Sequence, residues 1–323
     1  MSKCVLCGST EKLTDEHIFP DALGGCVVLA MGTCATCNST ASTQFEAEFI
    51  NGFGVIRQLL GIKNREGRVP SLRASVEIEG QPHVAVIKPK GNVEIPPMKI
   101  ERQVEAGRKE IIYRTFKKGD AERIIEKAKG KGIKLEDAPI ADLAREFDAV
   151  VHVPFDFIGT QSGLRTAAKT AYIALAFKTG VGYALSSTFD NVRNYCRNGV
   201  SPSPARLFLN DNFQASFHIG PHQHAIVCAG DAKTKRAHAL VIFFGNLFYY
   251  VRLSDAYEGA DFNWTMACDA QRDEEVKFIV GEYDNEFLML EDIVSGRTRW
   301  DNVKQSGDYL MQNMSRILGL KFE

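Results

Sequence analysis

Two cysteine pairs near the N-terminus have the spacing of a metal site. Cys4 is paired with Cys7, and Cys34 with Cys37, each in the form Cys-x-x-Cys. This spacing places two thiolates on one tight turn, and two such turns supply the four thiolates of a closed tetrahedral zinc site. The sequence therefore predicts a structural Zn²⁺. The alternative is four buried or redox-active cysteines, and the regular pairing at both ends of one short segment argues against it.

The segment between the pairs carries residue types that assist attack by water. His17 has an imidazole with an ordinary pKa of about 6.5, so it is partly neutral and can act as a general base at pH 7. Glu16 precedes it, and Asn38 follows the last cysteine directly. Carboxylate and amide oxygens are hard ligands that suit Mg²⁺ or Mn²⁺, whereas soft thiolates suit zinc. These donors would suit a hard catalytic cation such as Mg²⁺ or Mn²⁺ beside the structural zinc, and the two metals need not compete for ligands.

The order of these elements resembles the HNH endonucleases, and most closely the branch with the pattern EHIFP…LGG…CxxCN. The resemblance covers residues 4–46. It implies a β-hairpin and a following helix that hold one divalent cation, and a histidine that activates water to cut a phosphodiester. Carried over to this chain, the resemblance makes His17 the general base and Glu16 a ligand of the catalytic metal. Asn38 then corresponds to the third signature position, at or near the metal.

The loop after the histidine departs from the family pattern. The family typically has an asparagine after the Gly-Gly pair that braces the histidine loop, and residues 26–33 contain none. We therefore expect another group, such as a backbone carbonyl, to orient His17. Neighbouring side chains of a regular strand point to opposite faces, so Glu16 and His17 can serve one site only from a strand end or a bulge.

Glu46 is a further candidate for the metal shell. It lies on the helix expected over residues 39–49, and a spacing of two times four residues from Asn38 predicts a common helix face. Two interpretations stay open: Glu46 completes the shell of the catalytic metal, or it is an ordinary solvated glutamate. Because asparagine is a weaker ligand than histidine, we expect more water molecules on that metal.

Composition and charge limit the classes of protein to consider. The chain has 323 residues, of which 45% are hydrophobic and 24% charged, which is a normal globular mixture. No apolar run reaches membrane-spanning length, and eight cysteines of which four are in the paired motif fit a reducing compartment. We therefore expect a cytoplasmic protein without a membrane partner. A net charge of −1 excludes a non-specific DNA-coating protein, so DNA contacts must come from local patches.

The expected fold class is α+β, with two domains. Residues 1–62 are predicted to form a zinc-stapled ββα-metal (HNH) module, and residues 63–323 a larger α+β domain with an antiparallel sheet. The larger domain is expected to serve recognition, dimerisation or regulation. Its predicted elements are a hairpin over residues 74–87, a helix over 162–178, strands over 206–209, 224–228, 238–244, 247–253 and 277–282, and a helix over 309–318.

Several polar residues of the larger domain have a structural interpretation. Lys169 and Arg165 lie on the expected helix over residues 162–178. They could face a phosphate, but the usual interpretation, which we predict, is an amphipathic side chain that reaches solvent. His222 and His224 alternate at the start of an apolar strand without an acidic neighbour in the sequence, so we do not expect a second metal site there.

The first functional hypothesis is a metal-dependent HNH-type DNA endonuclease, with bacterial or phage restriction or defence as its context by analogy. The second is a catalytically inactive, zinc-dependent nucleic-acid-binding protein, which the missing asparagine and the near-zero net charge favour. The third is an RNase, since the chemistry is similar. DNA is the expected partner before RNA, and a homodimer through residues 63–323 and an activating ligand are further hypotheses.

Overall fold

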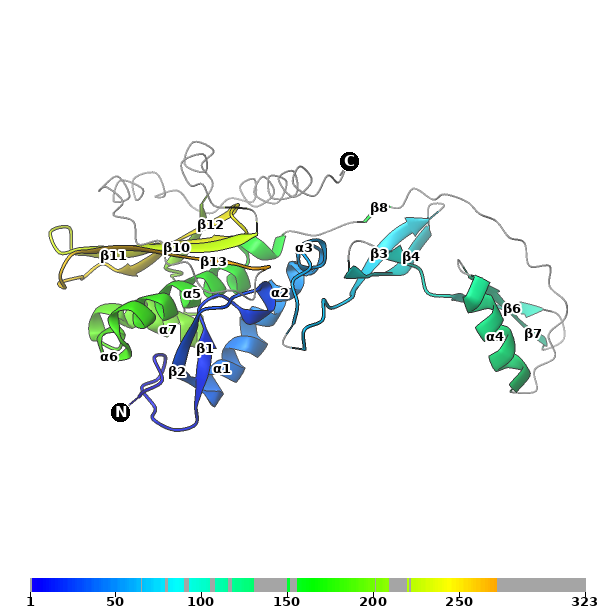
Figure 1. Cartoon of the computed structure of the whole chain (residues 1–323), viewed down its shortest axis with the longest axis horizontal. Coiled ribbons are helices and arrows are strands. Elements are labelled where there is room, and N and C mark those ends of the chain that lie inside the picture. The colour runs from blue at the N-terminus through cyan, green and yellow to red at the C-terminus, as the bar shows by residue number, and fades with distance from the viewer. Residues whose placement is uncertain are drawn as a thin grey trace. The chain divides into compact units, whose positions relative to one another are not determined.

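The computed structural model describes residues 2–64, 66–78, 81–89, 93–104, 108–115, 118–130, 150–151, 156–200, 202–208, 220 and 222–271 (Figure 1). The chain forms two compact units. The first consists of residues 1–69 together with 154–323, and the second of residues 70–153. The strand predicted over residues 277–282 and the helix over 309–318 lie outside the described residues.

The N-terminal part of the first unit is a hairpin followed by a helical segment. Strand β1 (Leu13–His17) pairs antiparallel with β2 (Val28–Cys34), and the chain enters α1 (Ala35–Ala41) directly from β2. The Sγ atom of Cys34 accepts a hydrogen bond from the backbone N–H of Cys37, which caps this helix start. A π-helical turn η2 (Ser42–Glu46), α2 (Ala47–Gly52) and α3 (Gly54–Leu59) follow.

The hairpin is irregular beside the candidate catalytic residues. Thr14 pairs with Thr33, but Glu16 pairs with Leu29, so β2 contains extra residues between these pairs. Met31 occupies this bulge with a φ of 47°, and its backbone N–H donates to a carboxylate oxygen of Asp15 at 2.9 Å. The hairpin therefore has a bulge, but it lies in β2 opposite Asp15 and not at Glu16 and His17.

The rest of the first unit consists of helices and one large sheet. The helical elements are η4 (Asp156–Gly159), α5 (Gln161–Thr179), α6 (Val181–Ala184), η5 (Ser187–Phe189) and α7 (Asp190–Asn198). The antiparallel sheet has the order β13-β10-β11-β12-β9. Its strands are β9 (Ala205–Phe208), β10 (Gln223–Asp231), β11 (Arg236–Phe243), β12 (Leu247–Ser254) and β13 (Phe262–Asp269). A mixed helix and sheet fold with an antiparallel sheet is confirmed.

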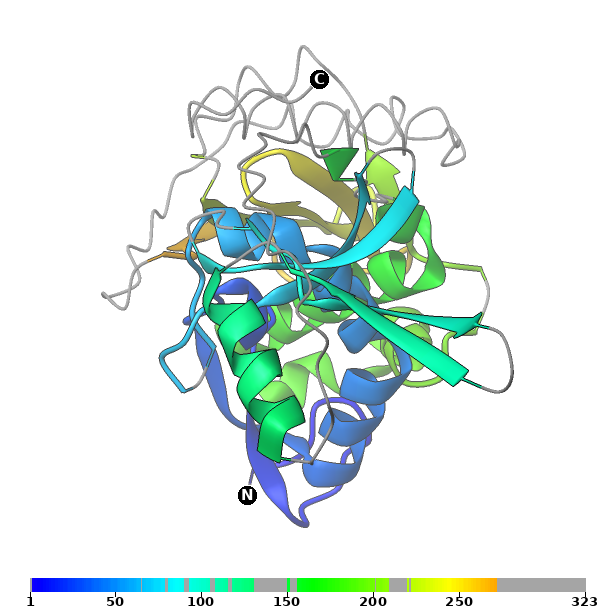
Figure 2. The same ribbon diagram turned by 90° about the vertical axis from the view of Figure 1, so that its right-hand side faces the viewer.

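Helix α5 is the central layer of the first unit. It packs against strands of the sheet on one side and against η2 and β2 on the other (Figures 1 and 2). Its alanine-rich middle is fully buried, which permits this close packing on two sides. Figure 1 shows the sheet above α5 and the N-terminal hairpin below it.

One continuous hydrophobic core joins the N-terminal segment to α5 and the sheet. Phe49 is fully buried and makes edge contacts with Phe243 at 5.1 Å and Tyr249 at 6.3 Å between ring centroids. This grouping differs from a division of the chain at residue 62, because the apolar face of α2 has its partners on the distant sheet. Amphipathic patterns predict that a face is buried, but not which element covers it.

The second unit consists of short sheets and one helix. Strands β3 (Leu72–Ile78) and β4 (Gln81–Ile87) form the predicted hairpin, extended by β5 (Val93–Glu94) and β8 (Val150–Val151) in the order β5-β4-β3-β8. A separate hairpin pairs β6 (Met98–Val104) with β7 (Arg108–Arg114), and α4 (Lys118–Gly130) follows it.

Candidate active site and metal centre

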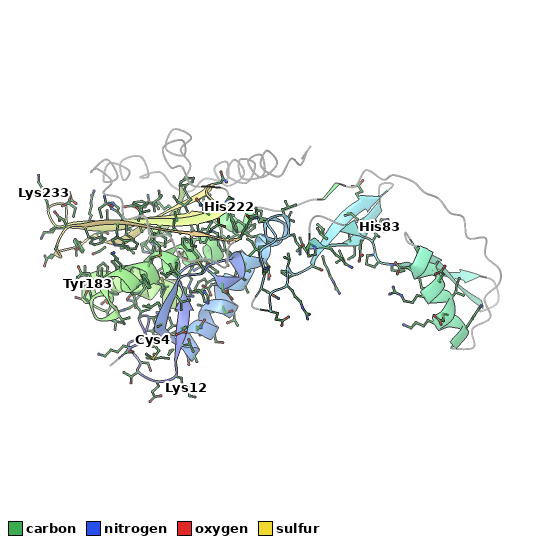
Figure 3. The ribbon with its side chains drawn as sticks, in the orientation of Figure 1. Cys4, Lys12, His83, Tyr183, His222 and Lys233 are labelled. Carbon is green, nitrogen blue, oxygen red and sulfur yellow. The ribbon has the colours of Figure 1, made fainter. Side chains whose placement is uncertain are left out.

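The four paired cysteines come together in one cluster. Cys4 and Cys7 lie on the turn before β1, Cys34 ends β2, and Cys37 lies in the first turn of α1; Figure 3 shows Cys4 beside the hairpin. Their Sγ atoms all lie within 4.8 Å of one another, and those of Cys7 and Cys34 are 3.6 Å apart. Four sulfurs at about 2.3 Å from a tetrahedral zinc are about 3.8 Å apart, so the cluster fits structural zinc.

The electrostatics of the cluster also fit a cation. Burial raises the pKa of the Cys4 thiol. Burial, followed by the charge of the neighbouring Cys4, raises the pKa of Cys37. Thiolates this close repel one another and are stable together when a metal ion neutralises them. A bound zinc would tie the turn before β1 to the end of β2 and the start of α1.

His17 ends β1, half-buried, and its ring has a defined hydrogen bond. Its Nδ1 atom lies 3.0 Å from the backbone carbonyl oxygen of Gly25. Because a carbonyl oxygen only accepts, this hydrogen bond requires the proton on Nδ1 and leaves the lone pair on Nε2 of the neutral ring. The expectation that a backbone carbonyl replaces the missing asparagine is confirmed, and Nε2 is the atom able to act as a base.

Both glycines of the loop after His17 are required by close contacts. Gly24 has a φ of 90°, and a Cβ atom there would lie 2.4 Å from the backbone oxygen of Ala270 at the end of the sheet. A Cβ atom at Gly25 would lie 2.1 Å from the backbone oxygen of Phe19. Any larger residue would displace the carbonyl that orients His17.

Glu16 points into the protein and belongs to a buried charged cluster. One carboxylate oxygen accepts a hydrogen bond from the hydroxyl of Thr33 at 2.7 Å, and the other lies 2.5 Å from Nζ of Lys169. Lys169 also contacts Glu46 at 2.7 Å. The side chain of Lys169 is 3% exposed and that of Glu16 is 4% exposed. The prediction that Lys169 reaches solvent is therefore wrong, because it lies between two carboxylates in the interior.

Asn38 has a separate partner on the hairpin. Its amide nitrogen donates to the hydroxyl of Thr14 at 3.2 Å, and that hydroxyl donates to the carbonyl of Thr33 at 3.1 Å. The π-helical turn between Asn38 and Glu46 changes the helical spacing, so four-residue periodicity does not fix a common face for them. The recorded contacts thus bring Glu16 and Glu46 together through a lysine, whereas Asn38 and His17 bond elsewhere.

The arrangement around Glu16 does not fit a divalent cation. Both oxygens of Glu16 have protein partners, and one partner is itself a buried cation. Apart from the four thiols, the described part of the chain contains no group of three or more His, Cys, Asp or Glu ligand atoms close enough to share an ion. The resemblance implies Glu16 as a ligand of Mg²⁺ or Mn²⁺, and in this structure both of its carboxylate oxygens are already engaged by Thr33 and Lys169.

Residues 4–54 match the HNH endonuclease family. We call this matched segment the HNH module. The match, together with the cysteine cluster, supports a nuclease function and the nucleic-acid contact that such a function needs. No curated protein and no solved structure gave a significant match to the chain. Within the described residues, no helix is long and apolar enough to cross a membrane.

One side of α5 completes the HNH module through a row of polar side chains that sequence reasoning missed. These side chains are three or four positions apart and therefore lie on one side of the helix. Arg165 is buried there, so the prediction of a solvent-exposed side chain is wrong for it as well. Ser162 donates to Glu48, and Tyr172 donates to the carbonyl of Val5 at 3.1 Å. Arg165 donates to Gln44 at 3.2 Å and lies over the ring of Phe45 at 4.4 Å. Lys169 contacts Glu16 and Glu46.

His224 anchors the glycine loop of the HNH module to the sheet. Its Nδ1 accepts from the backbone N–H of Phe244 at 3.2 Å, so the proton is on Nε2, which donates to the carbonyl of Leu23 at 2.8 Å. The ring stacks on Phe19 at 5.0 Å between centroids. Burial lowers the pKa of His224 to about 4, so the ring is neutral at pH 7. His222 instead lies 3.3 Å from the carboxylate of Asp269.

Proposed function

We propose that the HNH module is an endonuclease that hydrolyses phosphodiester bonds of DNA, with His17 as the general base. The observation that carries the proposal is the hydrogen bond from Nδ1 of His17 to the carbonyl of Gly25, which leaves Nε2 as the basic atom. A base in the correct tautomer at a half-buried strand end can take a proton from an attacking water molecule.

The surroundings of His17 support this role. The four-cysteine cluster would bind zinc and hold the hairpin against α1, while the bond between Asn38 and Thr14 holds the start of α1 against β1. Because that bond uses the amide nitrogen of Asn38, its oxygen is the atom we assign to the substrate or to an ion of the reaction. No step is assigned to an ion bound by Glu16.

The preference for DNA, a cytoplasmic location and a context of bacterial or phage restriction or defence belong to the proposal through the HNH match alone. Regulation of the module by residues 63–323, through a dimer or an activating ligand, belongs to it in the same way. Among these parts, the preference for DNA is tested by the plasmid assay described next.

The test is cleavage of supercoiled plasmid by zinc-loaded protein in buffer with Mg²⁺, with Mn²⁺ and without added ion. We expect His17→Ala to reduce nicking by roughly 10² to 10⁴-fold, which is the usual contribution of a general base. His83→Ala, which changes a histidine in the second compact unit, should cut like the wild type. Cleavage by His17→Ala at the wild-type rate would contradict the proposal.

The second candidate is a zinc-dependent nucleic-acid-binding protein without catalysis. The buried ion pair of Glu16 with Lys169 favours it, because the family position for the catalytic metal is occupied by a lysine contact. In that case neither plasmid nor RNA is cut under any ion condition, and the wild type and His17→Ala bind DNA equally. Cleavage of RNA but not plasmid would support the RNase.

A further inference from the structure

A lysine ammonium contacts Glu16, the residue that the resemblance to HNH endonucleases makes a ligand of a divalent cation, and it also contacts Glu46. Nζ of Lys169 is 2.5 Å from Glu16 and 2.7 Å from Glu46. The remaining oxygen of Glu16 accepts from Thr33, whose side chain is fully buried. An ammonium with these two contacts already neutralises one of the two carboxylate charges in the interior.

The ammonium of Lys169 opposes a second cation at Glu16 by its charge. A divalent ion on Glu16 would need an oxygen at about 2.0–2.6 Å and would face the Lys169 ammonium at close range in the protein interior. Burial lowers the pKa of Lys169, but the carboxylates of Glu46 and Glu16 outweigh burial and hold the pKa above its ordinary value. Lys169 therefore does not release its contacts by losing its proton at neutral pH.

Helix α5 holds Lys169 in this place. Ser162, Arg165 and Tyr172 make the other contacts of the same row with the HNH module. The opposite side of α5 packs on the sheet in the continuous core. Because α5 is packed on two sides, it fixes the backbone of Lys169 beside the HNH module, and the buried ammonium meets Glu16 and Glu46 from there.

We propose that Lys169 replaces a divalent ion at Glu16. It is a positioning residue: a cation built into the chain that fixes Glu16 and thereby the end of β1, where His17 follows. Glu16 then binds no Mg²⁺ or Mn²⁺, and an ion used in the reaction would have to be held by other groups. The assignment of the cation stands on the contacts of Lys169, and only the clause on His17 rests on the proposed function.

The first test compares Mn²⁺ binding by zinc-loaded wild type and Glu16→Gln, followed by electron paramagnetic resonance of free Mn²⁺. We expect the same number of bound Mn²⁺ ions in both proteins, because Glu16 holds none. Loss of one Mn²⁺ site in Glu16→Gln would overturn the proposal. Glutamine keeps an oxygen acceptor for Lys169 or Thr33, so the variant retains the shape of the cluster.

The second test removes the built-in cation. Lys169→Ala leaves Glu16, Glu46 and the hydroxyl of Thr33 around the vacated position, and we expect it to gain one Mn²⁺ site. Mn²⁺ at about a hundred times its dissociation constant should then raise the melting temperature of this variant by roughly 5 °C. The wild type and Lys178→Ala, a control at an exposed lysine of the same helix, should show no such rise.

The gained site must depend on the carboxylates, so Lys169→Ala combined with Glu46→Gln should lose it. A folded Lys169→Ala protein that binds no more Mn²⁺ than the wild type would contradict the proposal. Where Lys169→Ala does not fold, the comparison of the wild type with Glu16→Gln decides. Neither readout uses DNA cleavage, so failure of the nuclease proposal in the plasmid assay is distinguishable from failure of this one.

Discussion

The HNH module contributes to two clusters of negatively charged side chains, and the negative charge is neutralised differently in each. In the thiol cluster, four negative ligands come from residues 4–37 and fit an ion taken from solution. In the carboxylate cluster, the cation is Lys169, which is 153 positions from Glu16 in the chain. A ligand motif in a sequence therefore identifies groups that need a cation, but it does not say whether a metal or a side chain supplies it.

The largest effect is expected where the cation comes from solution. Cys34→Ser removes one ligand of the zinc that we assign to the thiol cluster, and structural zinc contributes on the order of 10 kcal/mol to folding in small modules. We expect loss of bound zinc and cooperative unfolding of the module at a much lower temperature. Metal analysis and circular dichroism measure these effects.

Cys26→Ser is the matched control, since Cys26 is half-buried and lies outside the cluster. It should keep its zinc. If metal-free Cys34→Ser were as stable as the wild type, the thiol cluster would not need a metal ion, and the zinc assignment would be contradicted.

Loss of Lys169 from the carboxylate cluster should lower the free energy of unfolding by less than loss of a zinc ligand does. Lys169→Met keeps the length of the side chain but leaves the buried carboxylate of Glu16 and the partly buried one of Glu46 without their cation. A broken buried ion pair costs about 3–5 kcal/mol. Urea unfolding of zinc-loaded protein measures the loss, and Lys178→Met is the control. If the free energy of unfolding fell by less than about 1 kcal/mol, the contacts of Lys169 would contribute no more than ordinary surface ion pairs.

The stability of the protein should depend on pH through His224, which holds the glycine loop of the HNH module. Its pKa is lowered to about 4 in the folded protein, so below an unfolded pKa of about 6.5 the unfolded chain binds the proton first. Stability is then fully present above pH 6.5 and falls by up to roughly 3 kcal/mol as the pH falls towards 4.

The measurement is urea unfolding between pH 4.5 and 7.5 for the wild type and His224→Phe. Phenylalanine keeps a ring against Phe19 but cannot titrate, so its curve should have a smaller slope. Burial also lowers the pKa of His238 to about 4, so part of the slope should remain. If the free energies of unfolding of the wild type and His224→Phe changed with pH in parallel, the lowered pKa of His224 would be contradicted.

The smallest expected change in stability comes from the glycine that orients His17. Gly25→Ala places a methyl group 2.1 Å from the backbone oxygen of Phe19, and we expect a loss of about 1–3 kcal/mol. Plasmid nicking should fall by a larger factor than stability predicts, because the carbonyl of Gly25 moves away from Nδ1 of His17. Gly119→Ala is the control, since a Cβ there meets nothing within 4 Å.

Local spacing explains what the sequence predicted well. The cysteine pairs, the hairpin and the carbonyl partner of His17 all involve residues within about thirty positions of one another, where turns and strand pairing fix the distances. The same reasoning missed the environment of Lys169, because a buried lysine and a solvent-exposed one occupy a helix with the same periodicity.

The sequence by itself therefore determined the cysteine set, the match to the HNH endonucleases and the carbonyl partner of His17, all of which are short-range features. Only the tertiary structure decided which cation Glu16 meets, which residue anchors Leu23, and that the core of the module continues into α5 and the sheet. The physical reason is that Lys169 and His224 reach the module from 153 and 201 positions away. Burial energy selects such partners by surface complementarity, which no spacing within the sequence records.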